Sequence, residues 1–227
     1  ITVPDERLIK LAEIDNPKKV VPTTVEILDI AGLVKGASKG EGLGNQFLGN
    51  IRETDAIIHV LRCFENDNIT HVDGSINPVR DKEIIDIELQ LKDFETIENR
   101  LEKLEKQAKH GNDPKAKKMV EVAKRYKEVL ESGKSARTLE LHNEEERKIA
   151  KDFFLLTNKP VLYACNVDEA SAKTGNKFVE QVKEAIKDEN AELLVIAAAT
   201  EADIAELEEY EEKQLFLEEL GLKEPGV

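Results

Sequence analysis

An apolar run that leads directly into a glycine-rich loop constrains this chain more than any other stretch. We expect a buried strand at residues 23–30, because Val25, Ile27 and Leu28 have the pattern of one, and Asp29 stands where that strand would end. Five glycines follow within residues 32–44, so the loop can bring backbone N–H groups close to an anion. A carboxylate at a strand end can serve Mg²⁺, and the N–H of Gly32 can contact a terminal phosphate. An ordinary turn after a strand is the alternative interpretation.

Composition narrows the class of protein. The 227 residues are 35% charged and only 4% aromatic, with a net charge of -14, which argues against nucleic-acid binding by the bulk of the surface. Cys63 and Cys165 each lie in or beside an apolar run, as buried thiols of a reducing compartment do, and two cysteines give no sign of a zinc site. No apolar run approaches the ~20 residues of a membrane span, and no signal peptide is visible. We expect a cytoplasmic protein with no membrane partner.

Strand and helix patterns alternate along the chain. Apolar runs predict further strands at residues 56–61, 160–166 and 191–198. Amphipathic stretches predict helices at residues 5–14, 45–53, 143–156, 175–188 and 202–220. This alternation predicts an α/β fold with a mostly parallel sheet that is covered by helices on both faces.

A helical hairpin interrupts the alternation. Apolar residues at three-to-four spacing predict one helix of about 28 residues from Asp81, and Asp113 and Pro114 are typical of the start of a second. We therefore expect an antiparallel α-helical hairpin at residues 81–137. The expected domains are a nucleotide-binding domain in two parts, the inserted hairpin, and an acidic helix with a linker: residues 1–80 and 138–203, 81–137, and 204–227.

Three polar or small segments follow predicted strands, where open α/β sheets bind ligands. They are Asp29 with Gly32, residues 166–169, and Ala197 to Ala199. We expect Asp29, Asn166 and the alanines to meet at one edge of the sheet. The amide of Asn166 can pair with the amino group and N7 of adenine, although an asparagine after a strand can equally be a capping residue.

The string from Asp29 to Asn45 resembles the third nucleotide-binding motif of the Obg-related P-loop GTPases, and most closely that of the YchF/OLA1 family. The later segments match the fourth and fifth motifs in order and spacing. The resemblance implies a GTPase-type P-loop fold, Mg²⁺ held through water by Asp29, and hydrolysis of the β-γ phosphate bond. The family has Asn-x-x-Glu at Asn166 to Glu169 and favours ATP over GTP. Glu169 is one methylene longer than the aspartate of a guanine site, and Val167 replaces its lysine.

The attacking water needs a positioning group, and Leu33, at the usual glutamine position, cannot supply one. Residues 62–72 closely resemble the family's segment with a loop histidine, here His71, which the resemblance implies as the catalytic group. An imidazole can orient water or act as a general base near neutral pH. A solvated loop histidine is the open alternative, whereas His59, inside an apolar strand, is expected to be structural.

One family motif is missing from these residues. No Gly-x-x-x-x-Gly-Lys-Ser/Thr is present, and the family carries that phosphate loop before the position of Ile1. The chain begins without Met and stops at Val227, near where the family's C-terminal TGS domain begins. We therefore expect a fragment that binds triphosphate poorly and is inactive or nearly so.

The hairpin is basic in an otherwise acidic chain. Residues 100–137 hold 12 Lys and Arg against 6 Asp and Glu, a net of +6 that leaves -20 elsewhere. The cations toward its tip are Lys103, Lys106, Lys109, Lys115, Lys117, Lys118, Lys124 and Arg125. Contact with phosphates and a solvated helix face remain alternatives; the resemblance, which implies ribosome or RNA partners, favours the first. Without interleaved aromatic residues, any RNA contact would be to the backbone.

Two functional hypotheses follow. The first is a nucleotide-dependent hydrolase and switch that prefers ATP, with GTP as the weaker ligand, uses Mg²⁺ and binds a ribosome or RNA. The second is a non-catalytic ribosome- or nucleic-acid-binding module with an incomplete nucleotide pocket.

Overall fold

A computed structural model describes residues 1–3, 5–30, 43–71, 74–111, 113–207 and 217. The chain divides into two compact units, Ile1–Gly32 and Leu33–Val227.

Helix α1 (Glu6–Asp15) dominates the first unit. Asp5 caps it, because its carboxylate accepts a hydrogen bond from the backbone N–H of Arg7 at 2.9 Å. The helix ends at Asn16, whose left-handed φ of 45° lets its N–H bond to the carbonyl of Ala12. The helix predicted from periodicity is therefore confirmed to within one residue.

The predicted buried strand at residues 23–30 is not formed, so that expectation is wrong. Thr24 makes a single antiparallel bridge to Thr2, and pairing stops there. Val25 and Ile27 are 52% and 57% exposed. A strand needs a hydrogen-bonded neighbour along its length, and this segment's only described neighbour is three residues long.

The second unit is built on a parallel sheet in the order β1-β2-β3: β1 (Ile57–Arg62), β2 (Val161–Asn166) and β3 (Glu192–Ile196). Ile57 pairs with Val161 at the start of the sheet, and Asn166 pairs with Ile196 at its end. All three strands therefore finish along the same edge. The predicted strands are confirmed, although β3 ends before Ala198, which begins a helix instead.

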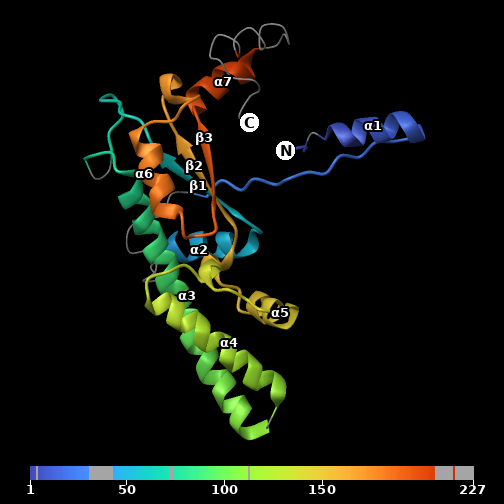
Figure 1. Cartoon of the computed structure of the whole chain (residues 1–227), viewed down its shortest axis with the longest axis vertical. Coiled ribbons are helices and arrows are strands. Elements are labelled where there is room, and N and C mark those ends of the chain that lie inside the picture. The colour runs from blue at the N-terminus through green and yellow to red at the C-terminus, as the bar shows by residue number, and fades with distance from the viewer. Residues whose placement is uncertain (4, 31–42, 72–73, 112, 208–216, 218–227) are drawn as a thin grey trace. The chain divides into compact units, whose positions relative to one another are not determined.

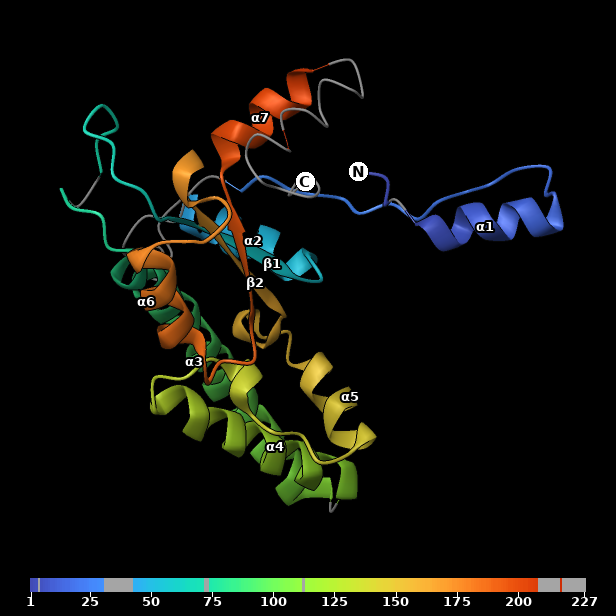
Figure 2. The ribbon, with the colours of Figure 1, turned by 45° about the horizontal axis from the view of Figure 1, so that its top comes forward.

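Helices lie on both faces of this sheet, as predicted (Figures 1 and 2). Helix α6 (Lys177–Ile186) places Phe178, Val179 and Val182 against Tyr163 and Cys165 of β2 in one buried cluster. The remaining elements of this unit are α2 (Leu43–Glu53), α5 (Glu144–Asp152), α7 (Ala198–Glu206), and the 3-10 turns η2 (Ala136–Thr138), η3 (Leu156–Asn158) and η4 (Glu169–Ser171). Helix α7 begins four residues earlier than predicted.

The predicted hairpin is present as α3 (Pro78–Gly111) and α4 (Pro114–Glu131), which lie side by side and extend away from the sheet (Figure 1). Asp113 caps α4 through the N–H of Lys115 at 2.8 Å, with Pro114 at the first turn as expected. Tyr126 of α4 and Phe153, just after α5, meet edge to face at 6.0 Å in a second buried cluster. No described helix is both long and apolar enough to cross a membrane.

Candidate nucleotide site

The carboxyl ends of β2 and β3 bring two of the predicted site segments together. The side-chain oxygen of Asn166 accepts a hydrogen bond from the backbone N–H of Ala198 at 3.0 Å. Its backbone carbonyl accepts from the N–H of Cys63 at 2.7 Å. No described residue accepts a hydrogen bond from the Asn166 amide nitrogen, and the side chain is partly exposed. The carbonyl keeps a second lone pair, so the amide can still accept and donate at one edge of a purine.

The alanine segment turns from β3 into α7. Ala197 is buried, whereas Ala198 and Ala199 are exposed at the first turn of the helix. The small side chains leave the backbone N–H of Ala198 accessible to Asn166, which fixes the orientation of its amide. The capping interpretation of Asn166 is thus true in part, since it caps the neighbouring segment.

The other residues of the fourth motif divide into distinct roles. Val167 is 4% exposed and packs in the sheet core, so its side chain covers no ligand there. Asp168 caps η4 by accepting from the N–H of Ser171 at 2.9 Å. Glu169 is exposed on the surface beside these residues. The buried position of Val167 beside α6 agrees with the absence of the lysine that covers the base in guanine sites, because a branched apolar side chain gains more from burial.

Asp29 belongs to the first unit, in the extended segment before residue 31, and it is exposed. Gly32 and Leu33 lie outside the described residues, as does most of the glycine-rich loop. Among the residues that the structure describes, no group of three or more His, Cys, Asp or Glu side chains gathers as metal ligands. A lone exposed carboxylate nevertheless fits Mg²⁺, which commonly binds one or two carboxylates together with substrate phosphates and waters.

His71 lies between β1 and α3 and is held in place. Its Nε2 lies 3.0 Å from Oδ2 of Asp81 in the first turn of α3, and the His71 side chain is 17% exposed. Arg80 donates two hydrogen bonds to the other oxygen of Asp81, at 3.0 and 2.8 Å. The solvated-histidine alternative does not fit this arrangement, because a carboxylate orients the imidazole. His59 is structural as expected: burial, with help from nearby cations, lowers its pKa to about 4.

The α3–α4 hairpin is called the arm from here on. The eight cations predicted toward its tip are not equivalent. Lys118 and Arg125 bind opposite oxygens of Glu146 at 3.1 and 2.9 Å and so fasten α5 to α4. Lys106 pairs with Glu102 at 2.6 Å and Lys124 pairs with Glu105 at 3.2 Å, and these four side chains are largely exposed. Exposed ion pairs of this kind contribute little to stability and exchange readily with other anions. The outer lysines are Lys103, Lys109, Lys115 and Lys117, all of them exposed.

Sequence patterns did not reveal a buried charged network at the base of the arm. Lys82 of α3 binds Asp86 at 2.6 Å and also binds Glu189, which follows α6. Glu189 in turn accepts from the hydroxyl of Tyr163 on β2 at 2.8 Å and from Arg137 at 3.1 Å. Burial would lower the pKa of Lys82, but the two carboxylates outweigh it and raise that pKa. Only the i,i+4 spacing of Lys82 and Asp86 was visible as a local signal.

Asp93 forms a second connection that sequence patterns missed. Its side chain is buried, and it accepts hydrogen bonds from the N–H of Leu156 and from the N–H and hydroxyl of Thr157, each at 2.7 Å. Leu156 and Thr157 lie in η3, immediately before β2. Both connections therefore join the arm to the strand that ends at Asn166.

Comparison with known proteins agrees with this geometry. The sequence model of the 50S ribosome-binding GTPase family matches residues 7–125. The "Ribosome-binding ATPase YchF" of Bacillus subtilis (strain 168) is 52% identical over 229 residues, which cover 100% of this chain and 62% of that protein. The protein of the same name from Escherichia coli O157:H7 is 50% identical over 227 residues, covering 100% and 61%.

A solved structure, the Schizosaccharomyces pombe YchF GTPase, is similar with a TM-score of 0.81 and 35% identity over 98% of this chain and 61% of that one. The sheet, its crossovers and these matches define a P-loop GTPase-like fold. The chain belongs to the YchF family, among the 50S ribosome-binding GTPases. It spans about three fifths of the length of these relatives.

Proposed function

We propose that this chain serves a nucleotide hydrolase and molecular switch of the YchF type, which prefers ATP to GTP, uses Mg²⁺ and binds a ribosome or RNA in the cytoplasm. One observation carries the proposed preference for adenine. The side chain of Asn166 is oriented at the end of β2 by its hydrogen bond from Ala198, and no described residue accepts a hydrogen bond from its amide nitrogen. The relatives' printed names, which join ribosome binding to ATPase activity, support the rest.

Base selection follows from the donors and acceptors at this edge. Adenine offers an amino donor beside the N7 acceptor, which match the Asn166 carbonyl and amide nitrogen; guanine places a second acceptor, O6, opposite the carbonyl. A guanine site compensates with a carboxylate on N1–H and the 2-amino group. Glu169 begins η4, one methylene longer than the aspartate of such sites. A good bidentate pair discriminates between bases by about 1–3 kcal/mol.

Hydrolysis is assigned to two further residues. Asp29 would hold Mg²⁺ through water, and the ion would supply positive charge that offsets the negative charge of the phosphates. His71 orients or deprotonates the attacking water. Asp81 supports that role, since a carboxylate bound to Nε2 fixes the ring and stabilises the imidazolium that forms. Leu33 cannot position water, which leaves this task to another side chain.

The position of the arm depends on whether the nucleotide is bound as a triphosphate or has been hydrolysed. Asp93 connects α3 to η3, which precedes β2, and the Lys82–Glu189 network connects α3 to Tyr163 of β2, whose last residue is Asn166. A change that is transmitted along β2 would therefore shift the base of the arm rather than be absorbed in a loop. The outer lysines would then dock on phosphates with a different geometry in each state.

Calorimetric titration tests the proposal. Mg-ATP and Mg-GTP are titrated against this chain and against a fusion that adds the Bacillus subtilis segments outside the aligned region. We expect the fusion to bind ATP more tightly and to hydrolyse it, and His71→Ala to retain binding but lose most turnover. Preference for GTP would overturn the base assignment, unchanged turnover of His71→Ala would remove its role, and binding by neither protein would favour the non-catalytic module.

A further inference from the structure

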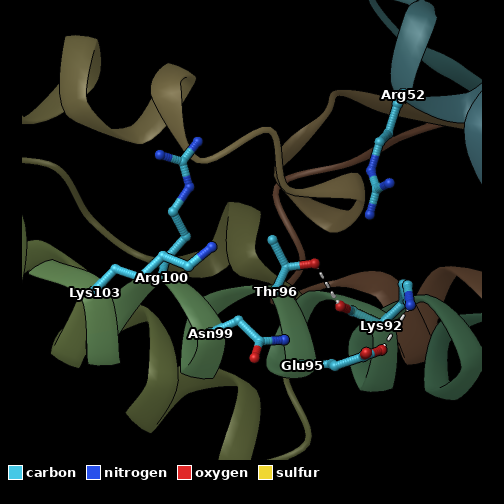
Figure 3. Close-up of a pocket in the computed structure, with 7 residues that line it drawn as sticks. All are labelled: Arg52, Lys92, Glu95, Thr96, Asn99, Arg100 and Lys103. Carbon is cyan, nitrogen blue, oxygen red and sulfur yellow. Dashed lines mark hydrogen bonds and ion pairs between the residues drawn. The ribbon is translucent and has the colours of Figure 1, made fainter.

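A basic groove lies at the base of the arm, outside the nucleotide site. It has a volume of about 310 Å³ and is formed by the last turn of α2 and one side of α3. Figure 3 shows Arg52 on one wall and Lys92, Thr96, Asn99, Arg100 and Lys103 along α3 on the other. The α3 residues at positions 92, 96, 99, 100 and 103 recur every three to four residues and so share one face of that helix.

The groove carries a surplus of positive charge. Its lining has four cations and a single acid, Glu95, which Lys92 already binds at 2.6 Å. Arg100 donates to the backbone carbonyl of Asp152 at 2.6 Å, a contact that positions the guanidinium without neutralising it. In the described part of the chain, the side chains of Arg52 and Lys103 make no hydrogen bond or ion pair. About three unneutralised charges therefore face one small volume in a chain of net charge -14.

This arrangement selects an anion with several charges. Two guanidinium groups supply forked donors that match phosphate oxygens, and lysines add point charges. The lining holds no aromatic side chain, so it offers no surface on which a base could stack. Lys103 also begins the row of outer lysines on α3, and the helix from Lys92 to Lys109 spans roughly 25 Å at 1.5 Å per residue. That length exceeds a single nucleotide and suits a continuous sugar-phosphate backbone.

We propose that the groove between α2 and α3 binds the phosphate backbone of RNA, with Arg52, Lys92, Arg100 and Lys103 as the contacts. This inference rests on the proposed ribosome or RNA partner and places that contact at the base of the arm as well as its tip. Recognition there is independent of sequence, because all the ligating groups address phosphate.

Fluorescence anisotropy with a labelled, unstructured 20-nucleotide RNA tests the groove without added nucleotide. Arg52→Gln/Lys103→Gln removes two charges whose side chains form no hydrogen bond or ion pair among the described residues, and Lys10→Gln/Lys18→Gln removes two exposed charges from the first unit as the matched control. We expect the groove pair to weaken binding about tenfold at 0.1 M salt and to lower the slope of log K against log salt by about 1.4. The control pair should change neither quantity by more than its experimental scatter.

Three outcomes would overturn the proposal that this groove binds the RNA backbone. If a tip variant, Lys109→Gln/Lys115→Gln, weakens RNA binding while the groove pair matches its control, the arm binds RNA and the groove does not. If the wild-type chain binds no RNA at 0.05 M salt, the groove and the proposed RNA partner both fail. If tripolyphosphate displaces the RNA at an equal concentration of phosphate groups, the groove is a small-anion site instead.

Discussion

Replacing Asp93 with alanine measures how strongly the arm is attached to the sheet. Asp93 is 1% exposed and accepts hydrogen bonds from two backbone N–H groups and one hydroxyl, all at 2.7 Å. Burial raises the pKa of Asp93 even though these three donors act to lower it. The desolvation of the carboxylate therefore offsets part of what the hydrogen bonds contribute.

The magnitude follows from these opposing effects. Hydrogen bonds to a charged group contribute about 1.5–3 kcal/mol each, so three contribute roughly 4.5–9 kcal/mol before desolvation. Asp93→Ala removes the desolvation cost as well, but it leaves the donors of Leu156 and Thr157 buried without a partner. We expect a net loss of about 3–5 kcal/mol, as is usual when one member of a buried charged network is removed. A domain's whole stability is about 5–15 kcal/mol.

Urea unfolding followed by far-UV circular dichroism checks this value. The matched control is Asp113→Ala, which removes an exposed helix cap with one backbone hydrogen bond of 2.8 Å and should cost about 1 kcal/mol. If Asp93→Ala costs no more than Asp113→Ala, Asp93 does not fasten η3 to the arm and the proposed coupling through β2 loses its support.

Three further predictions follow from buried contacts. A hydrogen bond from the N–H of His142, and then neighbouring cations, lower the pKa of Glu146 from 4.5 to about 2. The stabilisation that ionised Glu146 gives the fold is therefore complete above pH 4.5 and is lost as the pH falls toward 2. The urea midpoint of Glu146→Gln should therefore change less with pH in this range than that of the wild type. Cys63 and Cys165 are fully buried, so a thiol reagent should label neither until urea unfolds the chain. Asn176→Ala loses the cap of α6 and a 2.7 Å bond to the Cys63 carbonyl, which should cost about 1–2 kcal/mol by the same unfolding assay.

Local patterns predicted most of this fold. The three-to-four spacing of apolar residues located α3 and α4, and Asp113 with Pro114 marked the start of α4 because capping is a property of adjacent residues. Apolar runs located β1 and β2 to within a residue. The position of Asn166 was also predictable, since a polar residue that ends a buried strand lies at the edge of the sheet where the strands finish.

Contacts between distant residues could not be predicted in this way. Lys82 and Glu189 are 107 residues apart, and Asp93 lies 64 residues before Thr157, so no local spacing connects either pair. The run at residues 23–30 has the composition of a strand, but composition does not supply the neighbour that a strand must pair with. The burial of Val167 was not predictable for a related reason: only the packed structure shows which side of the chain faces α6.

Binding of Mg-ATP to Asn166→Asp in the YchF fusion tests the purine site most directly. Aspartate keeps the oxygen that accepts from Ala198 at 3.0 Å and has nearly the same shape, but it cannot donate to N7 of adenine. By calorimetry we expect ATP affinity to fall by about 10–100-fold, with unchanged urea stability. Wild-type ATP affinity in a folded Asn166→Asp protein would contradict the assignment of this sheet edge as the adenine site.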